Sequence, residues 1–304
     1  MTAGSTRSQD PLPPAQEPAR RLSFFNGSGS LFTPSEGWTS AALLLSAQLV
    51  AVVAIQTSGW IEPMPRLWLV APLGFLVGMG VAKVRGPFPV QLVLLALALA
   101  LGAGVAFWET AGTLSQGGLV DRFDETLTRL DQWSGAIGGQ GISNDRLPFA
   151  LILSGLAWAM AYFSSWFLFR FRWAWPAVSL PAIALLTNQT YLPNSHYPFP
   201  LTFFLLFSIL LIARVHFVNR VAVWRTLKLD QRISRRGFLL NAAVLTALVF
   251  TVGWAIPTQK IVIDPIRDRY QSARSPWAGL EDQFERVFAG IPSKRAAPLH
   301  GFGA

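Results

Sequence analysis

Seven predominantly hydrophobic stretches follow one another along the chain, and shorter polar segments separate them. A helix needs roughly 17–25 apolar residues to cross the hydrocarbon core of a bilayer, and most of the stretches reach that length. The pattern therefore predicts an all-α fold, a polytopic membrane helix bundle of about seven transmembrane helices. The stretches are 38–58, 67–84, 88–108, 149–169, 173–188, 198–213 and 237–256.

The fifth and sixth stretches are the weakest of the seven. Both are short, and Pro176 and Pro181 interrupt the fifth. Proline removes a backbone donor and bends a helix. Span 173–188 therefore either crosses the membrane fully or is re-entrant, and five or six spans remain alternatives to seven.

Two further stretches carry apolar residues at helical spacing between charged ones. In the segment 109–148 the apolar positions recur every three to four residues, which predicts an amphipathic helix on the outer membrane face or against the bundle. These positions are Leu119, Phe123, Leu127, Leu130, Trp133 and Ile137. In the segment 214–236, Phe217, Val221 and Trp224 repeat the pattern among arginines and predict a basic interfacial helix.

The two ends of the chain differ from the spans in composition. Residues 1–37 are rich in Pro, Ser and Gly and predict a disordered cytoplasmic tail. Residues 257–304 contain one helical stripe, but a segment of 48 residues is too small for an independent core. We expect this second tail to be extracytoplasmic and to lead into a further, C-terminal domain.

Charge supports this topology. Only 13% of the residues are charged, against roughly 25% in soluble domains, and the mean hydropathy is +0.39. Lys and Arg collect in cytoplasmic connections, and all inner connections are basic if the N-terminus is inside and the C-terminus outside. The residues expected to determine topology are Arg85, Arg170, Arg172, Arg214, Arg220, Arg225, Lys228, Arg232, Arg235 and Arg236.

The excess of Lys and Arg in the inner connections accounts for the net charge of +9. No basic and aromatic groove motif accompanies the charge, so we do not expect nucleic acid as a partner. The expected partner is the lipid bilayer. Several of the 12 tryptophans lie near predicted span ends, where indole rings favour the headgroup region.

The sequence "ISRRGFLLNAAVLT" at 233–246 resembles the start of a twin-arginine export signal. Such signals stand at an N-terminus, whereas Arg235 and Arg236 lie deep inside this chain. The simpler interpretation is that the pair supplies inner flanking charge to the last span. The alternative, that the pair directs twin-arginine export of the segment beyond that span, stays open.

Residues that carry chemistry are scarce. The chain has no Cys and three His, and the predicted span interiors contain no Asp, Glu, Lys, Arg or His. Ionisable residues at bilayer depth usually mark a function, so we expect no catalytic, cofactor-binding or metal-binding residues. Mildly polar span residues such as Gln48 and Ser165 predict contacts between helices, and Gly74 with Gly78 forms a GxxxG packing motif. Asn188 begins a glycosylation sequon, a match short enough to arise by chance.

The stretch "SPWAGLEDQFERVFAGIPSKRAAPLHGFG" at 275–303 resembles a junction in bacterial membrane transglutaminase-like proteins of the TgpA type. The resemblance implies that the multi-span region precedes an extracytoplasmic transglutaminase-like domain with a Cys-His-Asp triad. Without Cys, no triad residue can be assigned in this chain, and His300 is not a counterpart. Possible contacts with such a domain are Trp277, Phe284, Lys294 and Arg295.

The resulting functional hypothesis is a membrane anchor and presentation region for a transglutaminase-like, cysteine-type domain in the bacterial cytoplasmic membrane. This chain would then be the membrane part of a larger protein, or would act with a separately encoded domain. A free-standing polytopic scaffold or transporter is the alternative. An intramembrane enzyme is disfavoured because the spans offer no acid, base or nucleophile.

Overall fold

A computed structural model describes residues 37–138, 145–190 and 198–226, together with residues 244, 247, 248 and 251. The regular elements formed by these residues are all α-helices, as the hydrophobic pattern predicted. They are α1 (Trp38–Thr57), α2 (Leu67–Lys83), α3 (Phe88–Leu114), α4 (Leu119–Gly138), α5 (Leu147–Phe171), α6 (Ala174–Thr190) and α7 (Pro198–Thr226).

Four of these helices are long and apolar enough to cross a membrane, namely α1, α3, α5 and the Phe199–Arg220 part of α7. Helix α2 is also apolar but has only 17 residues, and α6 has the same length. Helix α4 is the predicted amphipathic helix, so the seven labelled helices are not the seven predicted spans. The last predicted span, 237–256, lies almost entirely outside the described residues.

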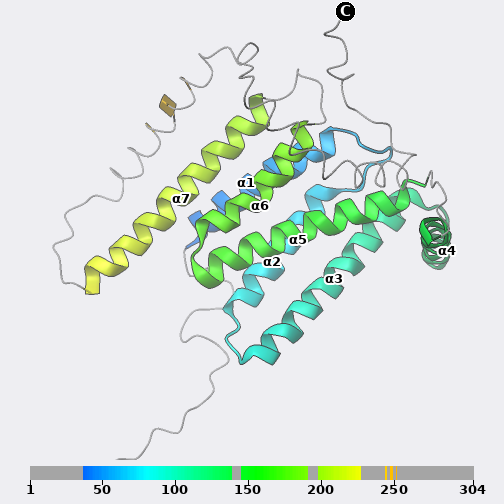
Figure 1. Ribbon diagram of the computed structural model, residues 1–304, viewed down its shortest axis with the longest axis horizontal. Helices are drawn as coiled ribbons and strands as arrows, with labels where there is room; N and C mark the ends of the chain where they lie inside the picture. Colours follow the sequence, from blue (N-terminus) through cyan, green and yellow to red (C-terminus); the bar gives the residue numbers. More distant parts are fainter. Residues whose placement is uncertain are drawn as a thin grey trace, which may run out of the picture.

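The six apolar helices run side by side, each antiparallel to its neighbour in the chain, and α4 lies at one end of the bundle (Figure 1). We call this end the α4 end. It also holds the α1–α2 connection and the residues where α6 ends and α7 begins. The opposite end holds the α2–α3 and α5–α6 connections, which contain Arg85 and Arg172, and we call it the basic end.

Helix α5 is the central element, because it packs against α1, α2, α3, α4 and α6. Its most extensive contact is with α2, and that contact depends on the two glycines of the GxxxG motif. A Cβ atom at Gly78 would lie 2.3 Å from the Tyr162 carbonyl oxygen, and one at Gly74 would lie 2.8 Å from the Trp158 carbonyl oxygen. The motif therefore lets two backbones approach closely, which is its usual role in membrane helices.

Helix α3 packs mainly against α5 and leaves a broad apolar surface uncovered. Only 17% of its apolar window is buried. Its exposed side chains include Phe88, Leu92, Val93, Leu97, Leu99, Leu101 and Trp108. A continuous apolar surface of this kind is unusual on soluble monomers, so it supports a membrane environment.

The fifth predicted span forms one continuous helix despite its two prolines. Pro176 lies in the first turn of α6, where its missing N–H leaves no helical bond unmade, and only Pro181 lies in the interior. Arg172, in the left-handed conformation at φ 60°, ends α5 and turns the chain into α6. A helix of 17 residues is about 26 Å long, slightly short for the roughly 30 Å hydrocarbon core.

Helix α7 extends further than the sequence pattern suggested. The predicted span ended at residue 213, and a separate interfacial helix was expected around Phe217, but α7 continues without interruption to Thr226. Residues 201–226 contain neither Gly nor Pro, so nothing in the sequence breaks the helix there. The expected basic helix is thus the last part of α7.

Polar residues inside the bundle behave differently from one another. The Gln48 amide Nε2 donates to the Ala161 carbonyl oxygen at 3.4 Å and joins α1 to α5, as expected of an interhelical contact. The Ser165 hydroxyl instead donates to Tyr162 of its own helix, at 2.9 Å. Ser154 and Ser164 are buried without a hydrogen-bond partner among the described residues. Their contribution is therefore their small size, which lets helices pack closely.

Candidate functional site

The two ends of the bundle carry different charges. Among the described residues, all acidic side chains belong to the α4 end: Glu62, Glu109, Asp121, Asp124, Glu125, Asp131 and Asp145. Four arginines accompany them: Arg66, Arg122, Arg129 and Arg146. The side chains that the structure describes at the basic end include no acid and six cations: Lys83, Arg85, Arg170, Arg172, Arg214 and Arg220. The bundle thus has an electrostatic polarity along its helices.

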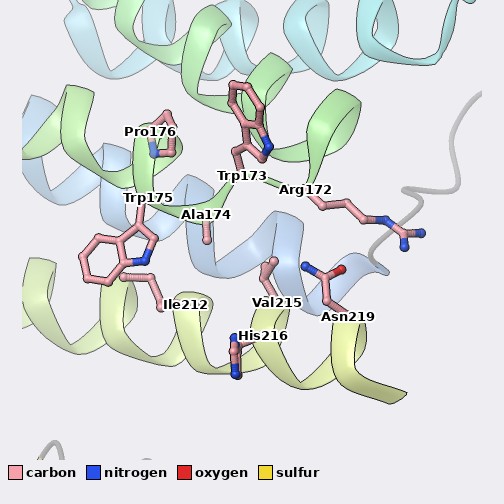
Figure 2. Close-up of a pocket in the computed structure, with 9 residues that line it drawn as sticks. All are labelled: Arg172, Trp173, Ala174, Trp175, Pro176, Ile212, Val215, His216 and Asn219. Atoms are coloured by element: carbon pink, nitrogen blue, oxygen red, sulfur yellow. The ribbon is translucent and has the colours of Figure 1, made fainter. Parts of the chain in front are cut away.

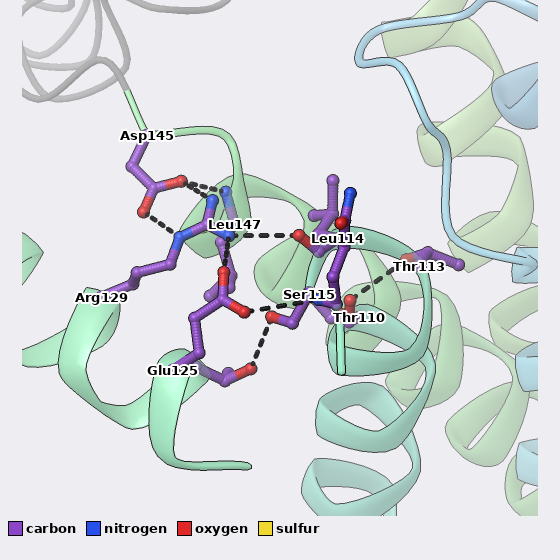
Figure 3. Close-up of polar contacts among 10 residues, drawn as sticks. Thr110, Thr113, Leu114, Ser115, Glu125, Arg129, Asp145 and Leu147 are labelled. Carbon is purple, nitrogen blue, oxygen red and sulfur yellow. Dashed lines mark hydrogen bonds and ion pairs between the residues drawn. The ribbon is translucent and has the colours of Figure 1, made fainter. Parts of the chain in front are cut away.

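At the α4 end, one arginine ties three helices together (Figure 3). The Arg129 guanidinium of α4 forms a two-pronged ion pair with the Asp145 carboxylate, just before α5, with its Nε atom 2.8 Å from Oδ2. It also donates to the Glu125 carboxylate and to the Leu114 carbonyl oxygen of α3, both at 3.3 Å. We call this group the Arg129 clamp. It holds the amphipathic helix against the end of the bundle.

The clamp keeps its charges at neutral pH. Burial of the Asp145 carboxyl opposes ionisation, but the hydrogen bond from Arg129 and the one from the Leu147 N–H outweigh it and lower the pKa of Asp145. The hydrogen bond to Asp145 in turn raises the pKa of the Arg129 guanidinium. About a quarter of each side chain is exposed, at 26% and 22%. These groups bind each other, so their role is to position α4.

Other polar contacts at the α4 end also join elements. Arg66 forms an ion pair with Glu109 at 3.2 Å, which links the start of α2 to the end of α3. The Trp60 indole donates to the Asn188 side-chain oxygen at 2.7 Å, and the Asn188 amide donates to the Ser58 hydroxyl at 2.9 Å. Asn188 is only 3% exposed, so the sequon match does not offer an accessible glycosylation site.

The basic end contains a surface pocket between the α5–α6 turn and α7 (Figure 2). We call it the Trp173 pocket. Its volume is about 250 Å³, and it is lined by residues 172–176 and by Ile212, Val215, His216 and Asn219 of α7. Trp173 and Trp175 are 53% and 69% exposed, and the Trp173 ring stacks on the rings of Phe171 and Phe167 of α5.

The Trp173 pocket is polar on one side and apolar on the other. Arg172 and Asn219 lie on the side nearer the tip of the basic end, whereas Trp175 and Ile212 lie on the side nearer the bundle interior (Figure 2). Asn219 follows Ile212 by seven residues, so the polar and apolar sides are about 10 Å apart along α7. A ligand with a polar head and an apolar body would match this order.

The neighbouring cations have structural contacts. Arg170 donates to the Val84 carbonyl oxygen at 3.0 Å and so ties α5 to the end of α2. Arg220 donates to the Nε2 atom of His216 at 3.0 Å, which fixes the imidazole beside the pocket. Arg214 is 5% exposed and donates to the Ser40 hydroxyl at 2.9 Å, joining α7 to the start of α1.

Arg214 departs from the expectation that cations stay in exposed connections. The chain was predicted to leave the membrane at residue 213, but Arg214 is part of the candidate span Phe199–Arg220. Its burial is tolerated because the guanidinium bonds to Ser40, near the start of α1.

The described residues include six of the ten predicted topology-determining residues. Arg85, Arg170, Arg172, Arg214 and Arg220 lie at the basic end, and Arg225 belongs to the last turns of α7. Lys228, Arg232, Arg235 and Arg236 lie outside the described residues, as do the proposed domain contacts Trp277, Phe284, Lys294 and Arg295. From its place in the sequence, Arg172 was predicted only to determine topology, and no pattern linked it to Asn219. The Trp-Ala-Trp-Pro sequence directly after Arg172 was the available signal.

Comparisons of this chain with protein-family models, with curated proteins and with solved structures found no match. Within the described residues there is also no group of three or more His, Cys, Asp or Glu residues that could hold a metal ion. Function is therefore inferred from the residues of this chain, from the polarity of the bundle and from the Trp173 pocket.

Proposed function

We propose that this chain is the membrane anchor and presentation region of a transglutaminase-like protein, held in the bacterial cytoplasmic membrane by seven spans. The observation that carries the proposal is the charge difference between the two ends of the bundle. Because Lys and Arg collect on the cytoplasmic side of a membrane, the basic end is inside and the α4 end is outside. Helix α1 begins at the basic end, so the N-terminal tail is also inside.

The position of α7 supports an outward C-terminal tail. Helix α7 finishes at the basic end, and the apolar stretch 237–256 can then cross the membrane once more. This last crossing puts residues 257–304 outside, where a transglutaminase-like domain would be presented. The resemblance of 275–303 to the junction in TgpA-type proteins is the reason for proposing a transglutaminase-like domain there.

Reporter fusions test the topology directly. Alkaline phosphatase, which is active only outside the cytoplasm, is fused after residues 59, 86, 140, 226 and 304 in turn. We expect activity after 59, 140 and 304, and none after 86 and 226. Equal activity after 226 and 304 would show that no span separates the two positions, and it would contradict the presentation role.

A second experiment tests the attached domain separately from the topology. The gene is read beyond codon 304, and the neighbouring genes are examined with it. An in-frame or adjacent domain with Cys, His and Asp in a transglutaminase-like arrangement supports the proposal. A stop codon with no such domain nearby would leave the topology intact but contradict the presentation role.

A free-standing lipid-binding scaffold is the second candidate, and the Trp173 pocket is the observation that favours it. An ion-coupled transporter is less well supported. Arg214 is buried, but it lies near the basic end rather than at mid-span and is bonded to Ser40.

A further inference from the structure

We propose that the Trp173 pocket binds the phosphate headgroup of one anionic phospholipid from the inner leaflet. The inference depends on the chain lying in a bilayer with its basic end inside. It does not depend on a transglutaminase-like domain. The site recognises a phosphate group. A lipid headgroup and a soluble phosphate compound both carry this group, so the test must distinguish them.

Charge is the first reason for this assignment. The side chains described at the basic end include six cations and no acid, so the local potential attracts anions. Basic pockets between transmembrane helices on the cytoplasmic side are suited to anionic headgroups. Arg172 lines the pocket, and its side chain extends from the α5–α6 turn toward the tip of the basic end (Figure 2). A guanidinium at this outer edge can donate two parallel hydrogen bonds to a phosphate.

The order of the lining residues is the second reason. Arg172 and Asn219 lie nearest the tip of the basic end, and Trp175 and Ile212 lie on the side nearer the bundle interior (Figure 2). A phospholipid inserted from the inner leaflet places its phosphate at the first pair and its glycerol and upper acyl chains at the second. Trp173 and Trp175 are half or more exposed, as expected of indole rings in the headgroup region.

The size of the pocket is the third reason. Its volume of about 250 Å³ is slightly below the range of roughly 300–1,000 Å³ typical of sites that enclose a whole small molecule. It therefore accommodates the headgroup and the adjoining glycerol region, while the rest of each acyl chain remains in the bilayer. Asn219 adds a neutral amide donor beside the guanidinium, which allows binding to be tested without changing the net charge.

Native mass spectrometry of the delipidated full chain, titrated with phosphatidylglycerol in detergent, measures the binding. We expect one preferred lipid, with phosphatidylcholine bound more weakly. The apparent Kd for phosphatidylglycerol should rise about fivefold or more in Arg172→Gly and in Asn219→Ala, because each loses a hydrogen-bond donor to the phosphate. Glycine adopts the left-handed conformation of position 172 without strain, so Arg172→Gly does not disturb the backbone turn between α5 and α6.

Arg85→Gln is the matched control, since Arg85 is exposed at the same end and does not line the pocket. Its Kd should change less than about twofold, as expected for one charge outside the site. Equal losses of lipid affinity in Arg85→Gln and Arg172→Gly, with none in Asn219→Ala, would mean that the lipid is held only by diffuse surface charge. That result would overturn the proposal. Glycerol 3-phosphate is titrated in parallel, and we expect it not to displace the lipid. Displacement at similar concentrations would overturn the lipid assignment in favour of a soluble phosphate compound.

Discussion

Gly78→Ala tests whether the close approach of α2 and α5 stabilises the bundle. The added Cβ would lie 2.2 Å from the Ser165 hydroxyl oxygen and 2.3 Å from the Tyr162 carbonyl oxygen. The hydroxyl can rotate away, but the carbonyl belongs to the α5 backbone, so the two helices must separate. Overpacking of this kind typically costs about 1–3 kcal/mol. Alanine also raises helix propensity by about 0.5–1 kcal/mol over glycine, which leaves a net loss of up to about 2.5 kcal/mol.

Gly80→Ala provides the matched control on the same helix, because a Cβ built at Gly80 meets no neighbouring helix or side chain within 4 Å. This variant gains only the helix propensity and should be neutral or more stable by up to about 1 kcal/mol. Unfolding is followed by circular dichroism during titration of the purified chain with sodium dodecyl sulfate. A second variant, Gly78→Ala with Ser165→Ala, should stay destabilised because the Tyr162 carbonyl remains in place. Equal stability of Gly78→Ala and Gly80→Ala would refute the reasoning.

Three further predictions concern polar contacts and use the same unfolding assay. Asp145→Asn should destabilise the chain by about 1–3 kcal/mol, since it weakens the charged bond to Arg129; the exposed Asp131→Asn should not. The lowered pKa of Asp145 means that this stability is present above the unfolded-state pKa of about 3.9 and is lost as the pH falls through the folded-state value. Asp145→Asn should therefore reduce the acid sensitivity of the chain, and an unchanged pH profile would count against the clamp. Arg214→Met and Ser40→Ala should be non-additive, with a coupling energy of about 0.5–3 kcal/mol, whereas strict additivity would mean that their bond contributes nothing. Trp60→Phe should cost about 1–3 kcal/mol because it leaves the buried Asn188 oxygen without its donor, and a neutral result would show that water replaces the indole.

Periodicity and hydrophobicity predicted where the described helices lie, apart from the end of α7. The amphipathic helix expected over 119–137 is α4, because its apolar positions recur at helical spacing and no proline interrupts them. The GxxxG pair was recognisable for the same reason, since only a small set of residues permits close backbone contact. Both patterns involve residues close together in the sequence, so they can be recognised without knowledge of the tertiary structure.

The contacts between distant residues could not be predicted in this way. Arg129 and Asp145 are 16 residues apart, and nothing in their spacing indicates that α4 folds back to bring them together. The Trp173 pocket joins the α5–α6 turn to α7, which depends on how the helices pack. The end of α7 was misplaced because Arg214 was interpreted as the start of a polar connection, whereas its bond to Ser40 lets it be buried inside a helix that no Gly or Pro interrupts.

The unequal lengths of the helices have a consequence for the surrounding bilayer. From Phe88 to Trp108, the apolar part of α3 is about 31 Å long, close to the thickness of a typical hydrocarbon core. Helices α2 and α6 have 17 residues each and reach only about 26 Å. Both present exposed apolar side chains, among them Leu76 and Ile183. Lipids beside these two helices must therefore compress by several ångströms, at a fraction of a kcal/mol per ångström, and a thinner bilayer suits this protein better than a thick one.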